Sequence, residues 1–187
     1  DAAPLLAIGG AAPWVSSGTG IFQECDQVAL FKPITKWADR CLDPHRIPEM
    51  IATALRQTST GRPGPVYLDM PGDVLYKEID EDSIVYPEPN TSMSKARPQG
   101  ELNAVRAAIE LLGEVERPVL VSGSGIIWSQ ASAELRQFVE QTGIPFYTTP
   151  QGRGVIPDDH ALSFMSARST AFREADCIMI VGTRMIY

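Results

Sequence analysis

The second half of the chain alternates between two kinds of apolar pattern, and this alternation constrains the fold more than any other feature. Stretches with apolar residues at helical spacing each precede a short apolar run that is typical of a buried strand. Helices are expected from Glu101, over 133–141 and within 166–174, and strands over 118–121, 144–147 and 177–181. Because short helix–strand connections favour parallel pairing, residues 101–187 are predicted to form a doubly wound α/β sheet.

The first half is organised around one stretch rich in proline and glycine, Gly61-Arg62-Pro63-Gly64-Pro65-Val66-Tyr67-Leu68-Asp69-Met70-Pro71-Gly72-Asp73. Val66-Tyr67-Leu68 predicts a buried strand, because the flanking glycines and prolines disfavour a helix. Asp69 and Asp73 fall at its carboxyl end, where open α/β sheets bind ligands. The other elements expected here are strands over 5–8 and 34–38, a brief helix between 24 and 33, and a helix from Asp43-Pro44 to Gly61.

Residues 76–100 separate the two halves. They lack an apolar period and contain Pro87, Pro89 and Pro98 together with several acidic residues, which is typical of a surface linker. We therefore predict two doubly wound parallel-sheet units, 1–75 and 101–187, joined by a linker over 76–100. Because the chain begins with Asp1 and ends directly after a strand, both units are expected to be incomplete pieces of a longer protein.

Composition narrows the function. The formal net charge of −7 and the lack of a Lys/Arg cluster argue against a nucleic-acid partner. The three cysteines, Cys25, Cys41 and Cys177, are far apart and show no metal-binding spacing, as expected of reduced thiols in a cytoplasmic protein. Every apolar stretch is much shorter than a membrane span, so no membrane partner is expected. Because the cysteines lack metal-binding spacing, no metal site within this chain is expected either.

Glycines follow all three strands of the second half, at Gly123 and Gly125, Gly152 and Gly154, and Gly182. Glycines at the carboxyl ends of parallel strands let phosphate groups approach the backbone. Short strand-to-helix turns also use glycine without any ligand, so both interpretations stay open. The dinucleotide fingerprint is absent, since Trp128 stands where its third glycine would fall, which disfavours a hydride-transferring dehydrogenase.

Two groups of side chains are candidates for ligand contacts. Arg168 and Arg184 are expected at the glycine-rich edge, where an arginine can bind a phosphate through two hydrogen bonds, although both could be ordinary surface residues. Phe22, Gln23 and Glu24 follow a glycine-containing loop and could line a polar site with one aromatic wall. Glu24 could equally supply favourable negative charge to a helix N-terminus.

Several motifs resemble thiamine-diphosphate enzymes of the acetolactate synthase group. In the first half these are Gly20-Ile21-Phe22-Gln23-Glu24, Ile34-Thr35-Lys36 and Gly61 to Pro71. In the second half they are Pro145-Phe146, Gly152-Arg153-Gly154-Val155-Ile156-Pro157-Asp158, Ala167-Arg168-Ser169 and Gly182-Thr183-Arg184. The resemblance covers nearly the whole chain and is greatest to 2-hydroxyacyl-CoA lyases and oxalyl-CoA decarboxylases.

This resemblance implies a domain assignment. Residues 1–75 would be the C-terminal half of the domain that binds the cofactor's pyrimidine, and residues 101–187 the N-terminal part of the central, nucleotide-binding-like domain. Phe22, Gln23 and Glu24 would be catalytic-site residues across a subunit interface. Arg56, Gly123, Gly125, Gly152, Arg168 and Arg184 would contact an ADP, CoA or FAD nucleotide.

The resemblance also implies the chemistry. Thiamine diphosphate and magnesium would be bound mostly outside these residues, so the 187-residue chain alone is expected to be inactive. The family cleaves or forms a carbon–carbon bond next to a carbonyl, here on a small-molecule substrate such as an acyl-CoA. A homodimer or homotetramer is implied for the full-length protein.

The chain departs from the CoA-dependent enzymes at Gly123-Ser124-Gly125, where they typically carry Gly-Lys-Gly, and at Met185-Ile186-Tyr187, where they have Asn-Trp. Two alternatives therefore accompany the lyase or decarboxylase prediction. One is an acetolactate synthase-like carboligase with FAD in the central domain. The other is a non-catalytic nucleotide-binding module.

Overall fold

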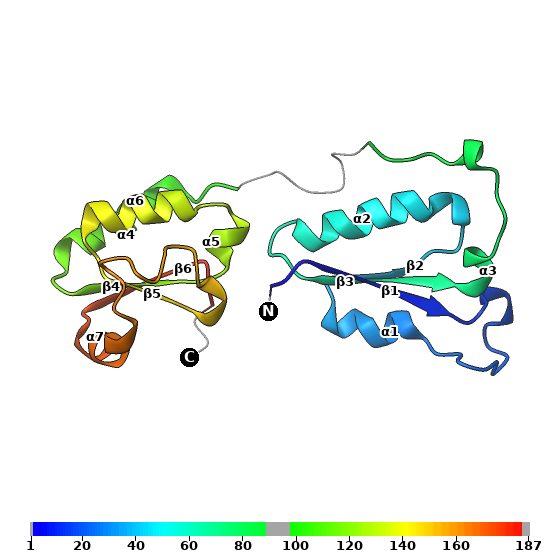
Figure 1. The fold of residues 1–187 in the computed structure, drawn as a ribbon, viewed down its shortest axis with the longest axis horizontal. Helices are drawn as coiled ribbons and strands as arrows, with labels where there is room; N and C mark the ends of the chain where they lie inside the picture. Colours follow the sequence, from blue (N-terminus) through cyan, green and yellow to red (C-terminus); the bar gives the residue numbers. More distant parts are fainter. Residues whose placement is uncertain (1, 89–97, 185–187) are drawn as a thin grey trace. The chain divides into compact units, whose positions relative to one another are not determined.

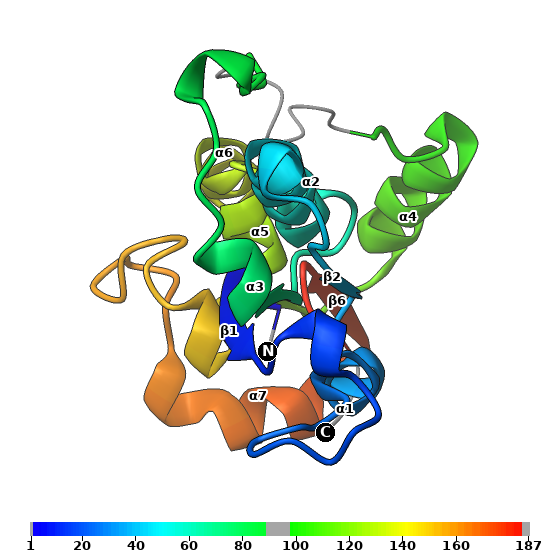
Figure 2. The ribbon, with the colours of Figure 1, turned by 90° about the vertical axis from the view of Figure 1, so that its right-hand side faces the viewer.

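The structure, a computed structural model, describes residues 2–88 and 98–184. The chain divides into two compact units, residues 1–96 and 97–187. Each unit contains a three-stranded sheet whose strands are all parallel, with helices on both faces (Figures 1 and 2). The predicted α/β class with two parallel sheets is confirmed. Among the described residues, no helix has both the length and the apolar character needed to cross a membrane.

The sheet of the first unit has the order β1-β3-β2, and its strands are β1 (Leu5–Ala11), β2 (Trp37–Arg40) and β3 (Pro65–Pro71). The central strand β3 is almost wholly buried. Leu68 and Met70 pack in a core with Met50 of α2 (Ile47–Ser59). Since side chains alternate along a strand, Tyr67 and Asp69 lie on the other face, which α1 (Gln27–Phe31) covers.

Several boundaries in this unit differ from the sequence prediction. The strand predicted over 34–38 is wrong in its position, because Pro33 lies in a 3-10 turn, η2 (Lys32–Ile34), that delays β2 to Trp37. β1 continues through Gly9 and Gly10, and α1 begins only at Gln27. The remaining short elements are η1 (Trp14–Ser16), η3 (Pro44–Arg46), α3 (Gly72–Leu75) and η4 (Glu81–Ser83).

The long helix of the first unit begins three residues later than predicted, at Ile47, and the predicted cap Asp43 instead precedes the 3-10 turn η3. The Asp43 carboxylate accepts a hydrogen bond of 3.0 Å from the His45 amide, and η3 leads directly into α2. Aspartate before proline thus provides the capping acceptor and the preset backbone angle of the first turn. Of the expected linker over 76–100, residues 89–97, including Pro89, lie outside the described residues.

The sheet of the second unit has the order β5-β4-β6, and its strands are β4 (Pro118–Ser122), β5 (Phe146–Thr148) and β6 (Cys177–Val181). Its helices are α4 (Leu102–Glu114), α5 (Gly125–Trp128), α6 (Ser132–Thr142) and α7 (Arg168–Glu174). Helices α4 and α6 cover one face and α7 the other (Figure 1). The predicted alternation is confirmed, with α5, η5 (Pro150–Gly152) and η6 (Met165–Ala167) as additions.

Packing in the second unit is uneven. Leu120, Val139, Phe146 and Ile156 form a fully buried core between β4, β5 and α6. Helix α4 adds Leu112 to the margin of this core but contributes no buried residue of its own. The apolar spacing that predicts α4 is therefore mostly exposed within the described unit.

Candidate functional site

Polar side chains meet at the carboxyl end of β3. Asp69 is fully buried, and its register neighbour on β2 is Arg40, whose Nε donates a hydrogen bond of 2.5 Å to Asp69 Oδ2. The Tyr67 hydroxyl lies 2.9 Å from Asp69 Oδ1 and 2.8 Å from Gln27 Oε1. Burial, and then the neighbouring Asp69 carboxylate, raise the pKa of the Tyr67 phenol, so it remains a protonated donor.

The predicted catalytic residues lie on one exposed turn. The loop between β1 and α1, residues 12–26, carries Phe22, which is 85% exposed, and Gln23, which has a left-handed φ of 65°. Glu24 accepts hydrogen bonds from the backbone amides of Gly18 and Gly20. These two amides lower the pKa of the Glu24 carboxyl below its ordinary value. Glu24 is thus occupied inside the loop, whereas Phe22 and Gln23 are presented to the outside.

Arg56 is not brought to this edge. It lies one turn before the end of α2, near the amino end of β3, and its Nη2 donates to Thr53 Oγ1 at 3.1 Å. Since α1 and α2 cover opposite faces of the sheet, Arg56 and the Tyr67–Asp69 pair are on different sides of it. Its nucleotide contact stays a prediction.

In the second unit, the predicted phosphate-binding glycines pack against one another. A Cβ on Gly152 would lie 2.6 Å from the Ser122 carbonyl oxygen and 2.8 Å from the Gly123 Cα. A Cβ on Gly125 would lie 2.7 Å from the Gly182 Cα. The turns after β4, β5 and β6 therefore approach so closely that a side chain would not fit, and this packing accounts for the glycines without a ligand.

The amides of these glycines already have acceptors. The Gly123 amide donates to the Val181 carbonyl at 3.0 Å, and the Gly125 amide to the Gly182 carbonyl at 2.8 Å. The Gly152 amide donates to the Thr149 carbonyl at 2.9 Å. In this arrangement none of the three is open to a phosphate oxygen, and a nucleotide at this edge would need other donors.

Other polar groups do lie near this edge. Arg184 follows β6 and is exposed, while the Arg168 guanidinium at the start of α7 lies 5.1 Å from the centre of the Phe172 ring. Ser122 and Thr148 pair in register at the ends of β4 and β5. Their hydroxyls are buried and have no hydrogen-bond partner among the described residues. Buried hydroxyls normally have a partner, so these two suggest that a polar group binds here.

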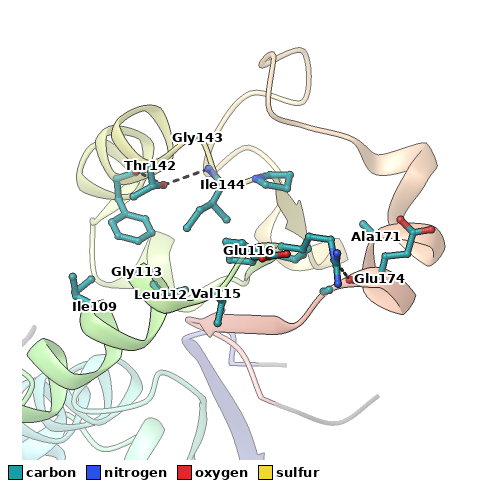
Figure 3. Close-up of a pocket in the computed structure, with 16 residues that line it drawn as sticks. Ile109, Leu112, Gly113, Val115, Glu116, Thr142, Gly143, Ile144, Ala171 and Glu174 are labelled. Carbon is teal, nitrogen blue, oxygen red and sulfur yellow. Dashed lines mark hydrogen bonds between the residues drawn. The ribbon is translucent and has the colours of Figure 1, made fainter.

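A pocket of about 750 Å³ lies at the opposite, amino-terminal edge of this sheet (Figure 3). Its wall is mainly apolar, with Ile109 and Leu112 from α4 and Ile144 before β5. The one arginine among its lining residues, Arg117, donates from Nε to the Glu174 carbonyl oxygen at 2.8 Å, which joins the residue before β4 to the end of α7. Because the lining is mainly apolar, we assign the pocket no chemistry.

One motif has a structural role that the sequence did not reveal. The Lys36 ammonium donates hydrogen bonds of 2.6 and 2.7 Å to the carbonyl oxygens of Gln57 and Thr60, at the end of α2. Its aliphatic stem covers Gly64, where a Cβ would lie 2.8 Å from Lys36 Cδ. Ile34-Thr35-Lys36 and the Gly61–Pro65 segment therefore form one helix-ending unit. Lys36 lies 21 and 24 positions before Gln57 and Thr60, so nothing in the local sequence pattern indicated the contact.

Comparison with known proteins shows what this chain is similar to. Residues 105–187 match the family described as thiamine pyrophosphate enzyme, central domain. The chain is 38% identical over 186 residues to a 2-hydroxyacyl-CoA lyase of Arabidopsis thaliana, which covers 97% of this chain and 32% of that protein. The chain is related to the thiamine pyrophosphate enzymes. The predicted resemblance is thereby confirmed.

Two further relatives have other activities in their names. The chain is 37% identical over 170 residues to oxalyl-CoA decarboxylase of Escherichia coli K12, covering 89% of this chain and 29% of that protein. It is 37% identical over 194 residues to a probable acetolactate synthase large subunit of Methanocaldococcus jannaschii, covering 98% and 32%. The chain thus spans about a third of the length of these thiamine pyrophosphate enzyme relatives.

Proposed function

We propose that this chain is part of a thiamine-diphosphate-dependent lyase or decarboxylase that cleaves or forms a carbon–carbon bond next to a carbonyl, on a substrate of the 2-hydroxyacyl-CoA or oxalyl-CoA type. The observation that carries the proposal is the match to a 2-hydroxyacyl-CoA lyase over 97% of the chain. The central-domain match adds support for the second unit. The cofactor supplies a carbanion-stabilising centre when bound, and this chain supplies groups that surround it.

Phe22 and Gln23 are the side chains of this chain that we assign to the substrate. Both are exposed on the turn of residues 12–26, so an apolar ring and an amide are free to contact a bound molecule. Glu24 we assign to the loop itself, because its carboxylate is engaged by Gly18 and Gly20. Completion of the site by a second subunit, in a homodimer or homotetramer, is part of the proposal.

The magnesium and diphosphate contacts are proposed to lie elsewhere in the longer protein. No cluster of three or more His, Cys, Asp or Glu side chains suited to a metal ion occurs within residues 2–88 and 98–184. The departure at Met185-Ile186-Tyr187 lies outside the described residues. The cytoplasmic location likewise stays a prediction.

For the second unit we propose an ADP-containing ligand, such as CoA, at the carboxyl ends of β4, β5 and β6. Arg184 and Arg168 supply positive charge there, and the Ser122 and Thr148 hydroxyls are buried at this edge with no hydrogen-bond partner among the described residues. Because the amides of Gly123, Gly125 and Gly152 are engaged, the arginines carry the phosphate contact. FAD in a carboligase is the second candidate, favoured by the 37% identity to an acetolactate synthase subunit.

The test uses the full-length protein that contains this chain. With thiamine diphosphate and magnesium present, we expect cleavage of a 2-hydroxyacyl-CoA or decarboxylation of oxalyl-CoA, measured by chromatography of the CoA products. Formation of acetolactate from pyruvate instead would establish the carboligase. The 187-residue chain alone, titrated calorimetrically with the cofactor and magnesium, should show no micromolar binding.

Nucleotide binding has its own comparison. A charge-assisted contact contributes about 1.5–3 kcal/mol, so Arg184→Ala should weaken CoA or ADP binding by about tenfold to a hundredfold at fixed salt. Arg136→Ala is the matched control, since Arg136 lies on α6 and pairs with Glu140 on the same helix at 2.8 Å. Equal effects of the two substitutions would mean that the nucleotide binds elsewhere. A turnover assay would then distinguish the lyase from the non-catalytic nucleotide-binding module.

A further inference from the structure

The loop of residues 12–26 packs little of its own surface, yet both of its ends are held. At its start, the Asp73 carboxylate accepts hydrogen bonds from the amides of Trp14 at 3.0 Å and Val15 at 3.1 Å. Asp73 lies in the first turn of α3, directly after β3. The beginning of the loop is therefore tied to the carboxyl end of the central strand.

The end of the loop is tied to the same strand by Gln27. Its Nε2 donates to the Gly10 carbonyl oxygen at 2.9 Å, which fixes the orientation of the side-chain amide. Its Oε1 then faces the Tyr67 hydroxyl at 2.8 Å. The Tyr67 ring is itself stacked on Phe31 of α1, with centroids 4.1 Å apart. Gln27 follows Asp26 directly, so the loop cannot move at this end without breaking these bonds.

Arg40 joins the two ends. Its Nε is held by the buried Asp69 carboxylate, and its guanidinium lies 4.8 Å from the centre of the Trp14 ring, at the start of the loop. Its Nη2 is 3.7 Å from Asp26 Oδ1, at the end of the loop. The Arg40 side chain, oriented by its hydrogen bond to Asp69, thus contacts both ends of the loop of residues 12–26.

We infer that Asp69, Tyr67, Arg40 and Asp73 are positioning residues that hold the loop of residues 12–26 so that Phe22 and Gln23 are presented in one arrangement. The role of that arrangement in catalysis rests on the proposed function. Two observations favour positioning over core stability. Burying an ion pair contributes little net stability compared with an apolar pair of similar size, and its best-attested effect is to specify one arrangement. In addition, the residues so held are exposed, Phe22 by 85%, and Gln23 has a left-handed backbone angle, which is strained for a residue other than glycine.

The experiment is Tyr67→Phe compared with Tyr147→Phe, in the full-length protein. Both tyrosines are buried and contact an aromatic ring, but no hydrogen bond of the Tyr147 hydroxyl is found among residues 2–88 and 98–184. Hydrogen–deuterium exchange of a peptide covering residues 12–26 should accelerate about fivefold in Tyr67→Phe, as expected for one lost hydrogen bond. Tyr147→Phe should leave that peptide unchanged.

Asp73→Asn provides a second variant, which weakens the tie at the other end and should accelerate the same peptide. In both loop variants kcat should fall several-fold with little change in KM, since the substrate site is present but misplaced. Unchanged exchange in both variants, even with a lower melting temperature, would overturn the inference and leave the network structural. Exchange decides this whether or not the parent protein turns over acyl-CoA, whereas a parent without turnover would overturn the proposed function alone.

Discussion

At the carboxyl edges of both sheets the loops are fixed in place, but by different groups: side chains in the first unit and backbone in the second. In the first unit, side chains hold the loop of residues 12–26. Asp73 of α3 and Arg40 of β2 contact it directly, and Asp69 and Tyr67 of β3 hold Arg40 and Gln27. In the second unit, the contacts are between backbone groups. The glycine turns after β4, β5 and β6 contact one another, and their amides donate hydrogen bonds to backbone carbonyl oxygens. Side chains can hold a loop at a distance and leave its tip free, whereas glycine contacts bring three turns together with no space between them.

The difference predicts where substitution is tolerated. At the glycine-built edge an added methyl group meets backbone, which cannot move without disturbing the sheet. At the side-chain-built edge a lost hydrogen bond loosens one loop and leaves the sheet intact. The predictions below test this contrast, from the largest expected effect to the smallest.

The largest effect is expected for Gly152→Ala. The new Cβ would lie 2.6 Å from the Ser122 carbonyl oxygen, so the turns after β4 and β5 must separate. We expect a loss of about 3 kcal/mol in the free energy of unfolding, the upper range for an overpacked interior site. Chemical denaturation of the 187-residue chain measures it.

Gly113→Ala is the control for that substitution. Gly113 lies in α4 with nothing within 4 Å of its Cβ position, so alanine should stabilise the helix by about 0.5 kcal/mol. A loss from Gly152→Ala no larger than 1 kcal/mol would show that the glycine turns separate easily. The contrast between the two edges would then fail, and the result would favour a ligand phosphate that binds between the turns.

A smaller effect is expected at the side-chain-built edge, from Gly9→Ala. A Cβ there would lie 2.2 Å from the Tyr67 hydroxyl oxygen, whereas one on Gly10 meets nothing within 4 Å. Because Tyr67 is stacked on Phe31, its ring cannot simply turn away. We expect a loss of about 2 kcal/mol for Gly9→Ala, as for moderate overpacking, and no comparable loss for Gly10→Ala. Thermal denaturation of both variants checks this, and equal melting temperatures would contradict it.

The two edges also differ in how far the sequence predicted them. The glycine turns were expected at Gly123, Gly125 and Gly152, because glycines after strands are visible in one dimension. Their cause was not, since contacts among three turns depend on the strand order β5-β4-β6. Periodicity found β6 with its observed bounds for the same local reason. It misplaced β2, where a proline turn interrupts an extended run.

The side-chain network was mostly invisible. Asp69 was expected at a strand end, but its partner Arg40 is 29 positions away and becomes a neighbour only through the β2–β3 register. No sequence pattern indicated the role of Gln27, because that role depends on the direction of the Gly10 carbonyl. Phe22, Gln23 and Glu24 entered through family resemblance. The structure then separates them by showing that Glu24 is bonded within its own loop.

The smallest expected effect is that of low pH on the loop of residues 12–26. The amides of Gly18 and Gly20 lower the pKa of Glu24 from its ordinary value of 4.5. For Asp73, burial opposes ionisation, but the amides of Trp14 and Val15 outweigh it, so its pKa is also lowered. A carboxyl whose pKa is lower in the folded than in the unfolded state stabilises the fold above the unfolded pKa and loses that effect as pH falls through the folded pKa. The loop should therefore loosen only below about pH 4.5.

Glycine-selective NMR of the 187-residue chain measures this loosening. The amide signals of Gly18 and Gly20 should shift with a midpoint below 4.5 in the parent, and the shift should be absent in Glu24→Gln. Glu101 provides the control from the second unit, since it accepts from the Asn103 and Ala104 amides at the start of α4 and its pKa is lowered in the same way. Glu101→Gln should leave the Gly18 and Gly20 curves unchanged. A midpoint at or above 4.5 in the parent would mean that the Glu24 carboxylate does not hold the loop in solution, and that this edge is fixed by Gln27, Tyr67, Arg40 and Asp73 without it.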